Sequence, residues 1–239
     1  MDYSKNLLYF TGKKSTDLMI LGGILCGILA FLGVAVFANA KGSNSPIPIV
    51  VGCVLLALGI WAIWAASTGM QKWPVSDSDY DNGVKNYIAN IKSIALDKLG
   101  VDESEVSEVA PIILGGYEFE GVDRVKKGED GKWRSNIYKV VALFFSPHEL
   151  HGYTMRFNTL RDEKTEGTDV YFYQDIVSAS TTSLTIKTTI EGKEITVNPE
   201  AFKLTTKGGT SFTVNLLDSA YGQESVKAMR ALLREKKQA

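Results

Sequence analysis

The sequence of 239 residues is poor in cysteine, in histidine and in net charge. Its two cysteines, Cys26 and Cys53, both lie in apolar stretches. Counting along two antiparallel helices separates them by about 9 Å, which is too far for an easy disulfide. The formal net charge is −1, and residues 69–239 carry 22 basic and 25 acidic residues. This balance disfavours a general attraction to nucleic acid but allows a local anion site.

Recognisable catalytic and metal-binding motifs are also missing. His148 and His151 have two residues between them, whereas the helical zinc motif needs three, and they fall in a predicted turn. The sequence has neither a glycine-rich phosphate loop after a strand nor a serine nucleophile elbow. Asp77, Asp79 and Asp81 imitate a calcium loop, but its twelfth position is isoleucine, which favours a linker with a helix cap. We therefore expect no enzyme, no metal and no cofactor.

Two uncharged apolar runs of 21 residues dominate the N-terminal third, over residues 18–38 and 47–67. As a helix, each run would be about 31 Å long, the thickness of a bilayer's hydrocarbon core. They predict a transmembrane hairpin over residues 18–68, preceded by a cytosolic tail over residues 1–17. Lysines are more frequent at the two ends than in the connecting loop, which places both termini in the cytoplasm. We expect a multi-pass protein of the bacterial inner membrane.

Small residues mark packing faces on both predicted spans. The first span has a GxxxG pattern, and the second repeats a small residue every seven positions; the residues are Gly23, Gly27, Gly52, Gly59 and Ala66. Either both seams join the two helices of one chain, or one of them joins the subunits of a homo-oligomer. The runs lack ionisable residues, so a pore between them would need an apolar gate.

In the remaining chain, the spacing of the apolar residues changes from a helical to a strand-like period at Pro111. Residues 69–110 read as a linker with an amphipathic helix over residues 84–99, which Gly100 ends. Alternating β-forming residues then predict seven strands and a closing amphipathic helix. The strands cover residues 112–120, 136–146, 153–160, 169–179, 184–190, 202–206 and 211–216, and the helix covers residues 223–236.

Seven strands and a closing helix resemble the pleckstrin-homology-like (PH-like) fold. The stretches Tyr171–Ser178 and Phe202–Phe212 look like those of bacterial membrane proteins with PH-like cytosolic domains. The resemblance implies an α+β membrane protein, with the transmembrane hairpin followed by a seven-stranded PH-like domain over residues 111–239. Members of this fold bind lipids, peptides or proteins, and many are scaffolds. Two short glycine-rich helices joined to a sensor also resemble the Hailong-type membrane effectors of anti-phage systems.

Two basic surfaces are candidate anion sites. The loop between the first two predicted strands is similar to the basic signature of PH domains. The final helix carries four cations on one side, Lys227, Arg230, Arg234 and Lys237. The candidate residues are Arg124, Lys126, Lys127, Lys132, Trp133, Arg134, Lys227, Arg230 and Arg234. The alternative is a solvated loop neutralised by its own acids, together with cations that stabilise a helix C-terminus.

Two functions remain open. One is an oligomeric membrane effector whose cytosolic domain senses a nucleotide or oligonucleotide and gates a ligand-gated ion channel in antiviral defence. The other is a membrane-tethered adaptor that binds lipid headgroups or a protein partner and conducts nothing.

Overall fold

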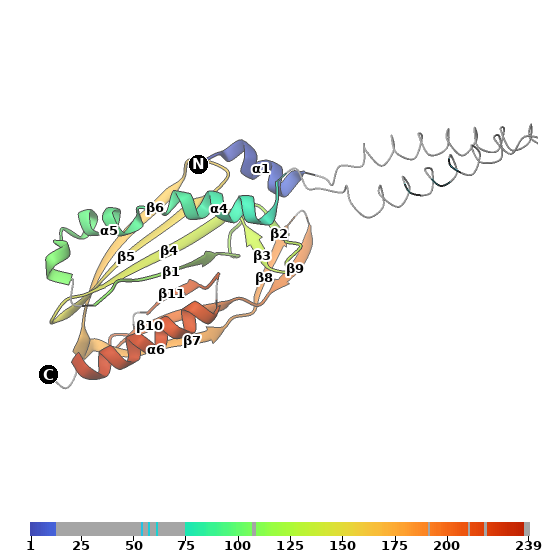
Figure 1. Ribbon diagram of the computed structural model, residues 1–239. Helices are drawn as coiled ribbons and strands as arrows, with labels where there is room; N and C mark the ends of the chain where they lie inside the picture. The colour runs from blue at the N-terminus through green and yellow to red at the C-terminus, as the bar shows by residue number, and fades with distance from the viewer. Residues whose placement is uncertain are drawn as a thin grey trace, which may run out of the picture. The chain divides into compact units, whose positions relative to one another are not determined.

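The computed structural model describes residues 1–12, 54, 57, 61, 75–106, 109–190, 192–209, 211–217 and 219–236. The chain divides into two compact units, Met1–Phe10 with Asp77–Ala239, and Thr11–Ser76. The strands and sheets below belong to the first of these units (Figure 1).

The predicted fold class and localisation require correction. Within the described residues, no helix is both long and apolar enough to cross a membrane, and strands dominate the first unit. The longest described helix, α6 (Ser219–Lys236), carries charged side chains from Glu224 to its C-terminal end, and charges are costly inside a bilayer. The prediction of an α+β membrane protein in the inner membrane is therefore wrong. The predicted spans over residues 18–38 and 47–67 lie outside the described residues, apart from Val54, Ala57 and Trp61.

The residues of the predicted packing faces cannot be compared with the structure either. Gly23, Gly27, Gly52, Gly59 and Ala66 all lie outside the described residues. Both apolar runs are long enough for a helix that crosses a bilayer. The length of a run does not by itself establish which helix forms there. Gating of a channel, which depended on these spans, stays an untested prediction.

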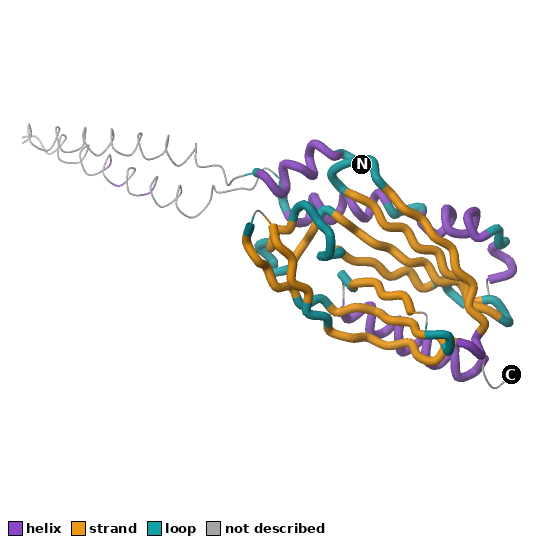
Figure 2. The backbone as a smooth tube through the Cα atoms, turned by 180° about the vertical axis from the view of Figure 1, so that it is seen from behind, coloured by secondary structure: helices purple, strands orange, loops and turns teal. Residues whose placement is uncertain are grey.

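Two antiparallel sheets form the body of the domain. The larger has the order β1-β4-β5-β6, and the smaller has the order β11-β10-β7. Their strands are β1 (Ile112–Tyr117), β4 (Ile137–Phe145), β5 (Glu149–Asn158), β6 (Lys164–Phe172), β7 (Ile176–Ser183), β10 (Glu200–Thr206) and β11 (Ser211–Asn215). The sheets approach each other at β1 and β11, where Leu217 donates its N–H to the Gly115 carbonyl (2.9 Å). Figure 2 shows the sheets as two layers.

The structure describes eleven strands, instead of the seven predicted, and four of the eleven form two short hairpins. They are β2 (Val125–Lys127) with β3 (Trp133–Ser135), and β8 (Ile186–Ile190) with β9 (Lys193–Val197). The predicted strand over residues 184–190 contains β8, whereas β2, β3 and β9 were not predicted. The three-residue strands β2 and β3 are too short to produce a period-two signal. The predicted strand over residues 169–179 is also divided, because the 3₁₀ turn η3 (Tyr173–Asp175) carries the chain from β6 to β7.

Helices lie against both sheets (Figure 1). Helix α1 (Tyr3–Thr11), α4 (Asp77–Tyr87) and α5 (Ile91–Leu99) lie on the side of the larger sheet, followed by the 3₁₀ helix η2 (Glu103–Val106), and α6 packs on β7 and β10. The predicted helix over residues 84–99 is thus two helices, interrupted at residues 88–90. Gly100 ends α5 in a left-handed conformation (φ 66°), as predicted.

The domain has a mixed apolar core and a second core made of aromatic rings. The mixed core lies between the sheets and α6, and includes Leu143, Phe202 and Met229. The aromatic core underlies α1 and α4: Tyr9 stacks on Tyr80 with ring centroids 4.4 Å apart, and Tyr80 stacks on Tyr117 at 5.8 Å. Each fully buried large side chain contributes about 1.5–3 kcal/mol. The aromatic core therefore holds α1, although α1 is separated from α4 by 65 residues of sequence.

Candidate functional site

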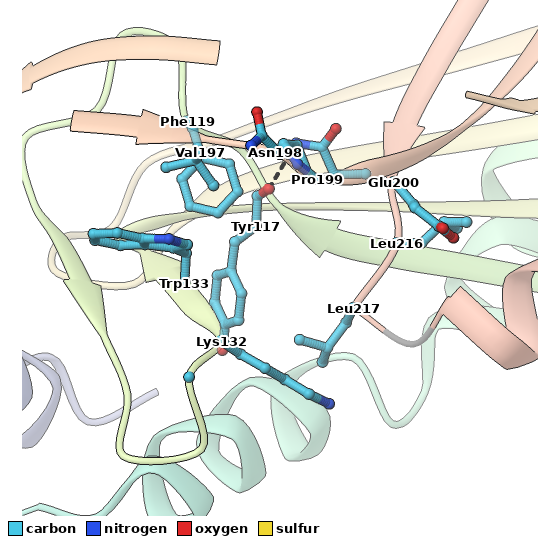
Figure 3. A pocket seen from close by; sticks show the side chains of 12 residues that line it. Tyr117, Phe119, Lys132, Trp133, Val197, Asn198, Pro199, Glu200, Leu216 and Leu217 are labelled. Carbon is cyan, nitrogen blue, oxygen red and sulfur yellow. Dashed lines mark hydrogen bonds between the residues drawn. The ribbon is translucent and has the colours of Figure 1, made fainter. Parts of the chain in front are cut away.

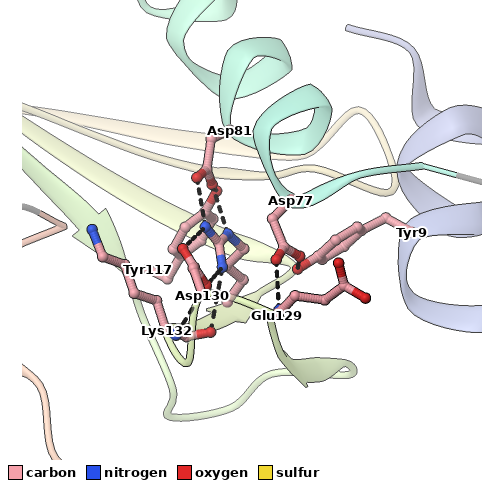
Figure 4. A network of polar contacts seen from close by, with 8 residues as sticks. Tyr9, Asp77, Asp81, Tyr117, Glu129, Asp130 and Lys132 are labelled. Atoms are coloured by element: carbon pink, nitrogen blue, oxygen red, sulfur yellow. Dashed lines mark hydrogen bonds and ion pairs between the residues drawn. The ribbon is translucent and has the colours of Figure 1, made fainter. Parts of the chain in front are cut away.

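The structure does not assemble the predicted basic loop into one site, because Arg134 points inward. The Arg134 side chain is 2% exposed. Its Nε and Nη2 donate to Asp81 Oδ1 and Oδ2 (2.9 and 2.7 Å), and its Nη1 and Nη2 donate to Asp130 Oδ1 and Oδ2 (2.9 and 2.8 Å) (Figure 4). Two carboxylates therefore occupy the whole guanidinium fork. Arg134 is a structural residue and leaves no face for a ligand.

The pKa values agree with this geometry. Burial opposes the charged form of Arg134, but hydrogen bonds to Asp130 and Asp81 outweigh it and raise the Arg134 pKa. The same hydrogen bond from Arg134 lowers the pKa of Asp130 to about 2. Arg134 and Asp130 are therefore both charged at neutral pH.

Arg134 and three aspartates form a polar network, which we call the clasp: Asp77 and Asp81 on α4, and Asp130 and Arg134 at the β2–β3 hairpin. Asp77 accepts hydrogen bonds from the Tyr9 hydroxyl (2.8 Å) and from the Glu129 N–H (2.7 Å). Asp81 also accepts the Tyr117 hydroxyl (2.7 Å). The clasp thus ties α1, α4 and the β2–β3 hairpin together, and Asp77 and Asp81 are anchors of the fold.

Three more cations of the predicted loop are engaged locally. Lys126 donates to the Tyr9 carbonyl (2.8 Å) and lies 4.1 Å from the centre of the Tyr9 ring. The Lys127 ammonium lies 5.8 Å from the centre of the Trp133 ring. Arg124 is half-buried and has interaction partners of its own. Lys126 and Lys127 therefore contact different aromatic rings and do not converge on a common point.

The three predicted cations of the final helix also differ in environment. Arg230 donates from Nε to the Ala179 carbonyl on β7 (2.6 Å), which joins α6 to the smaller sheet. Lys227 and Arg234 are exposed. This helix therefore uses one of its cations for packing and presents the other two to solvent.

Lys132 and Trp133 do come together, in a cavity of about 410 Å³ that we call the Trp133 pocket. Three chain segments far apart in the sequence supply its walls: the β2–β3 hairpin with the end of β1, the β9–β10 connection, and the end of β11. The lining residues are Tyr117, Phe119, Gly131, Lys132, Trp133, Val197, Asn198, Pro199, Glu200, Asn215, Leu216 and Leu217 (Figure 3). Nothing in the sequence marked residues 197–200 or 215–217 as part of a site.

The Trp133 pocket combines an apolar floor with two opposite charges. Tyr117 and Phe119 are buried below it, and the Lys132 side chain extends toward Leu217 (Figure 3). The Lys132 ammonium makes no hydrogen bond or ion pair with any described residue, although its charge helps to lower the pKa of Asp130. The Glu200 carboxylate accepts only a long hydrogen bond, from Gln223 (3.4 Å), among the described groups. Lys132, Glu200 and the Trp133 ring are thus available to a ligand.

Asn215 has a structural role at the back of this pocket. It is 8% exposed, and its Nδ2 donates to the Tyr117 carbonyl (2.8 Å). Gly116 lies against the same segment, because a Cβ there would be 2.6 Å from the Asn215 carbonyl carbon. The β1–β11 corner is therefore closely packed, and it provides a rigid wall.

No protein-family model matches this chain, and no relative is found among the curated proteins. The resemblance to PH-like domains and to Hailong-type effectors therefore stays a prediction from sequence. The predicted partners, a lipid bilayer, a homo-oligomer and an anionic ligand, likewise stay untested.

Proposed function

We propose that this chain is a ligand-binding protein, and that the Trp133 pocket takes a small molecule that joins a flat ring to one negatively charged group, with a nucleoside monophosphate as the representative. The observation that carries the proposal is that Lys132 and Trp133 line one pocket while the Lys132 ammonium is unpaired among the described residues.

The ring of such a ligand fits the apolar side of the pocket. Trp133 is half-buried, and Phe119 lies beneath the cavity. Stacking of a base on an aromatic side chain contributes about 1–3 kcal/mol per base. The cavity volume of 410 Å³ lies within the range of small-molecule sites, about 300–1,000 Å³.

The polar groups favour a single phosphate group on the ligand over a chain of phosphates. The Lys132 ammonium supplies a charge-assisted hydrogen bond to a phosphate. The Glu200 carboxylate in the same pocket repels further negative charge and accepts hydrogen bonds from amino groups on a ring. We therefore expect a monophosphate to bind more tightly than the corresponding triphosphate.

Calorimetric titration of the full-length chain with AMP, ATP and adenosine tests this proposal. A hydrogen bond to a charged group contributes about 1.5–3 kcal/mol, so Lys132→Glu should weaken AMP binding by about ten-fold or more. Trp133→Ala should weaken AMP and adenosine alike, because it removes the stacking surface. Lys193→Glu, the same charge change on an exposed strand outside the pocket, should leave the affinity unchanged.

Three results would contradict the proposal. They are an absence of AMP binding, equal AMP affinity in the wild type and in Lys132→Glu, or adenosine binding as tight as that of AMP. The last of these would show that Lys132 contributes nothing to recognition.

A further inference from the structure

A second and larger cavity lies between the two sheets, with a volume of about 910 Å³. The end of β1, β4 and β5 form one wall, and β7, β10 and β11 form the other. We call it the inter-sheet cleft. Phe119 and Asn215 line both this cleft and the Trp133 pocket, so they lie at the partition between the two cavities.

A lysine surrounded by hydroxyl groups forms the wall on the smaller sheet. Lys203 on β10 is directly opposite Ser180 on β7 and Thr213 on β11, and directly paired residues share a face. Thr182 and Ser211, two positions further along their strands, lie on the same face. All five residues line the inter-sheet cleft. The Lys203 ammonium and these four hydroxyls make no side-chain hydrogen bond or ion pair with the described part of the chain.

The opposite wall carries an ion-pair cluster that is only partly neutral. Glu118 accepts a hydrogen bond from Arg156 Nε (2.6 Å) and lies 3.9 Å from the Lys139 ammonium. Lys139 also donates to the Thr213 carbonyl (2.8 Å), which joins the two walls. With Lys203, the cleft contains three cations against two carboxylates, Glu118 and Glu120. An anion is therefore favoured in this cleft, although the chain as a whole is slightly acidic.

The side chains that line the cleft are suited to bind a phosphate ester of a sugar, through both the phosphate and the sugar hydroxyl groups. An ammonium flanked by serine and threonine hydroxyls donates several hydrogen bonds to phosphate oxygens. The cleft is near the upper end of the size range of small-molecule sites, so a phosphate alone would fill a small part of it. Carboxylates and further hydroxyls are partners for the hydroxyl groups of a sugar. The indole surface of the Trp133 pocket is not among the lining residues.

We propose that the inter-sheet cleft is a second binding site, for a phosphorylated polyol of the hexose phosphate class, in which Lys203 and the hydroxyls of Ser180, Thr182, Ser211 and Thr213 hold the phosphate. The site is independent of the ligand proposed for the Trp133 pocket, because the two cavities use different cations, Lys203 and Lys132.

The test is a calorimetric titration of the full-length chain with glucose 6-phosphate, glucose and inorganic phosphate. Glucose 6-phosphate should bind more tightly than either of the other two probes. Lys203→Glu should weaken its binding by about ten-fold or more. Thr213→Val, which keeps the shape and removes one hydroxyl, should weaken it by about three- to ten-fold. Lys193→Glu is the matched control and should bind like the wild type.

Cross-tests separate this site from the Trp133 pocket. Lys132→Glu should leave glucose 6-phosphate binding unchanged, and Lys203→Glu should leave AMP binding unchanged. If the circular dichroism spectrum shows that Lys203→Glu does not fold, Lys203→Met supplies the same test without the added negative charge. The proposal is overturned if glucose 6-phosphate does not bind, if the Lys203 variants bind it normally, or if inorganic phosphate binds equally well.

Discussion

Replacing Arg134 with methionine should strongly destabilise the domain, because the clasp would lose its only buried cation among the described residues. Arg134 makes four hydrogen bonds to two carboxylates and a fifth to the Lys132 carbonyl (3.3 Å). Methionine fills a similar volume but neutralises neither Asp81 nor Asp130. Asp81, whose side chain is 17% exposed, would keep the Tyr117 hydroxyl as a donor.

The size of the effect follows from the burial of the pair. Removing one partner of a buried ion pair costs about 3–5 kcal/mol, because the other charge is left without compensation. Asp81 retains some exposure and one donor, so we expect the lower end, about 3 kcal/mol. That is a large part of the roughly 5–15 kcal/mol by which a typical domain is stable. Adding Asp81→Asn to Arg134→Met should recover part of the loss, because it removes the unpaired charge.

Urea unfolding at neutral pH measures this difference. With a slope of about 2 kcal/mol per molar urea, the midpoint should fall by about 1.5 M. Arg161→Met is the matched control, because Arg161 also contacts two carboxylates, Asp123 (3.0 Å) and Glu163 (2.6 Å), but is 55% exposed. Exposed pairs contribute about 0–1 kcal/mol. The reasoning is refuted if Arg134→Met costs no more than Arg161→Met.

Two further predictions concern the clasp. A Cβ added at Gly128 would lie 2.6 Å from Asp130 Oδ1 and from Asp77 Oδ2, so Gly128→Ala should cost about 1–3 kcal/mol in urea unfolding. Gly167→Ala, which meets no atom within 4 Å, should cost far less, and equal costs would disprove the packing at Gly128. The second prediction concerns pH. The folded-state pKa of Asp130 is lowered from 3.8 to about 2, so its stabilisation is present above pH 3.8 and is lost as the pH falls toward 2. Asp130→Asn should therefore show a smaller loss of unfolding free energy over this range, and an unchanged slope would contradict the assignment.

Local patterns predicted the elements whose formation depends on nearby residues. The apolar spacing of the final helix placed Val226, Met229, Leu232 and Leu233 on one side. Val226, Met229 and Leu233 are buried, and Leu232 is partly buried. Gly208 and Gly209 marked the turn between β10 and β11, and Gly209 has a positive φ of 79°. The predicted strand over residues 136–146 contains β4. The division of residues 169–179 between two sheets escaped prediction, because the bend at η3 interrupts a stretch that is rich in β-forming residues throughout.

The candidate sites depended far more on tertiary structure. Lys132 and Arg134 stand two positions apart in one basic loop, yet one lines a pocket and the other is buried against Asp81, 53 residues away. Lys203 was not predicted as a site residue, because the hydroxyls around it come from two other strands.

The sequence by itself determined that the chain lacks a strong net charge, that its C-terminal part is built of strands closed by an amphipathic helix, and that cations gather near residue 130. These properties follow from composition and from periodicity over a few residues. Tertiary structure decided which cations face a cavity and which are neutralised by distant carboxylates. It also contradicted the prediction of a membrane protein. Burial and charge pairing depend on side chains that the fold brings together, and the spacing of residues along the chain does not encode them.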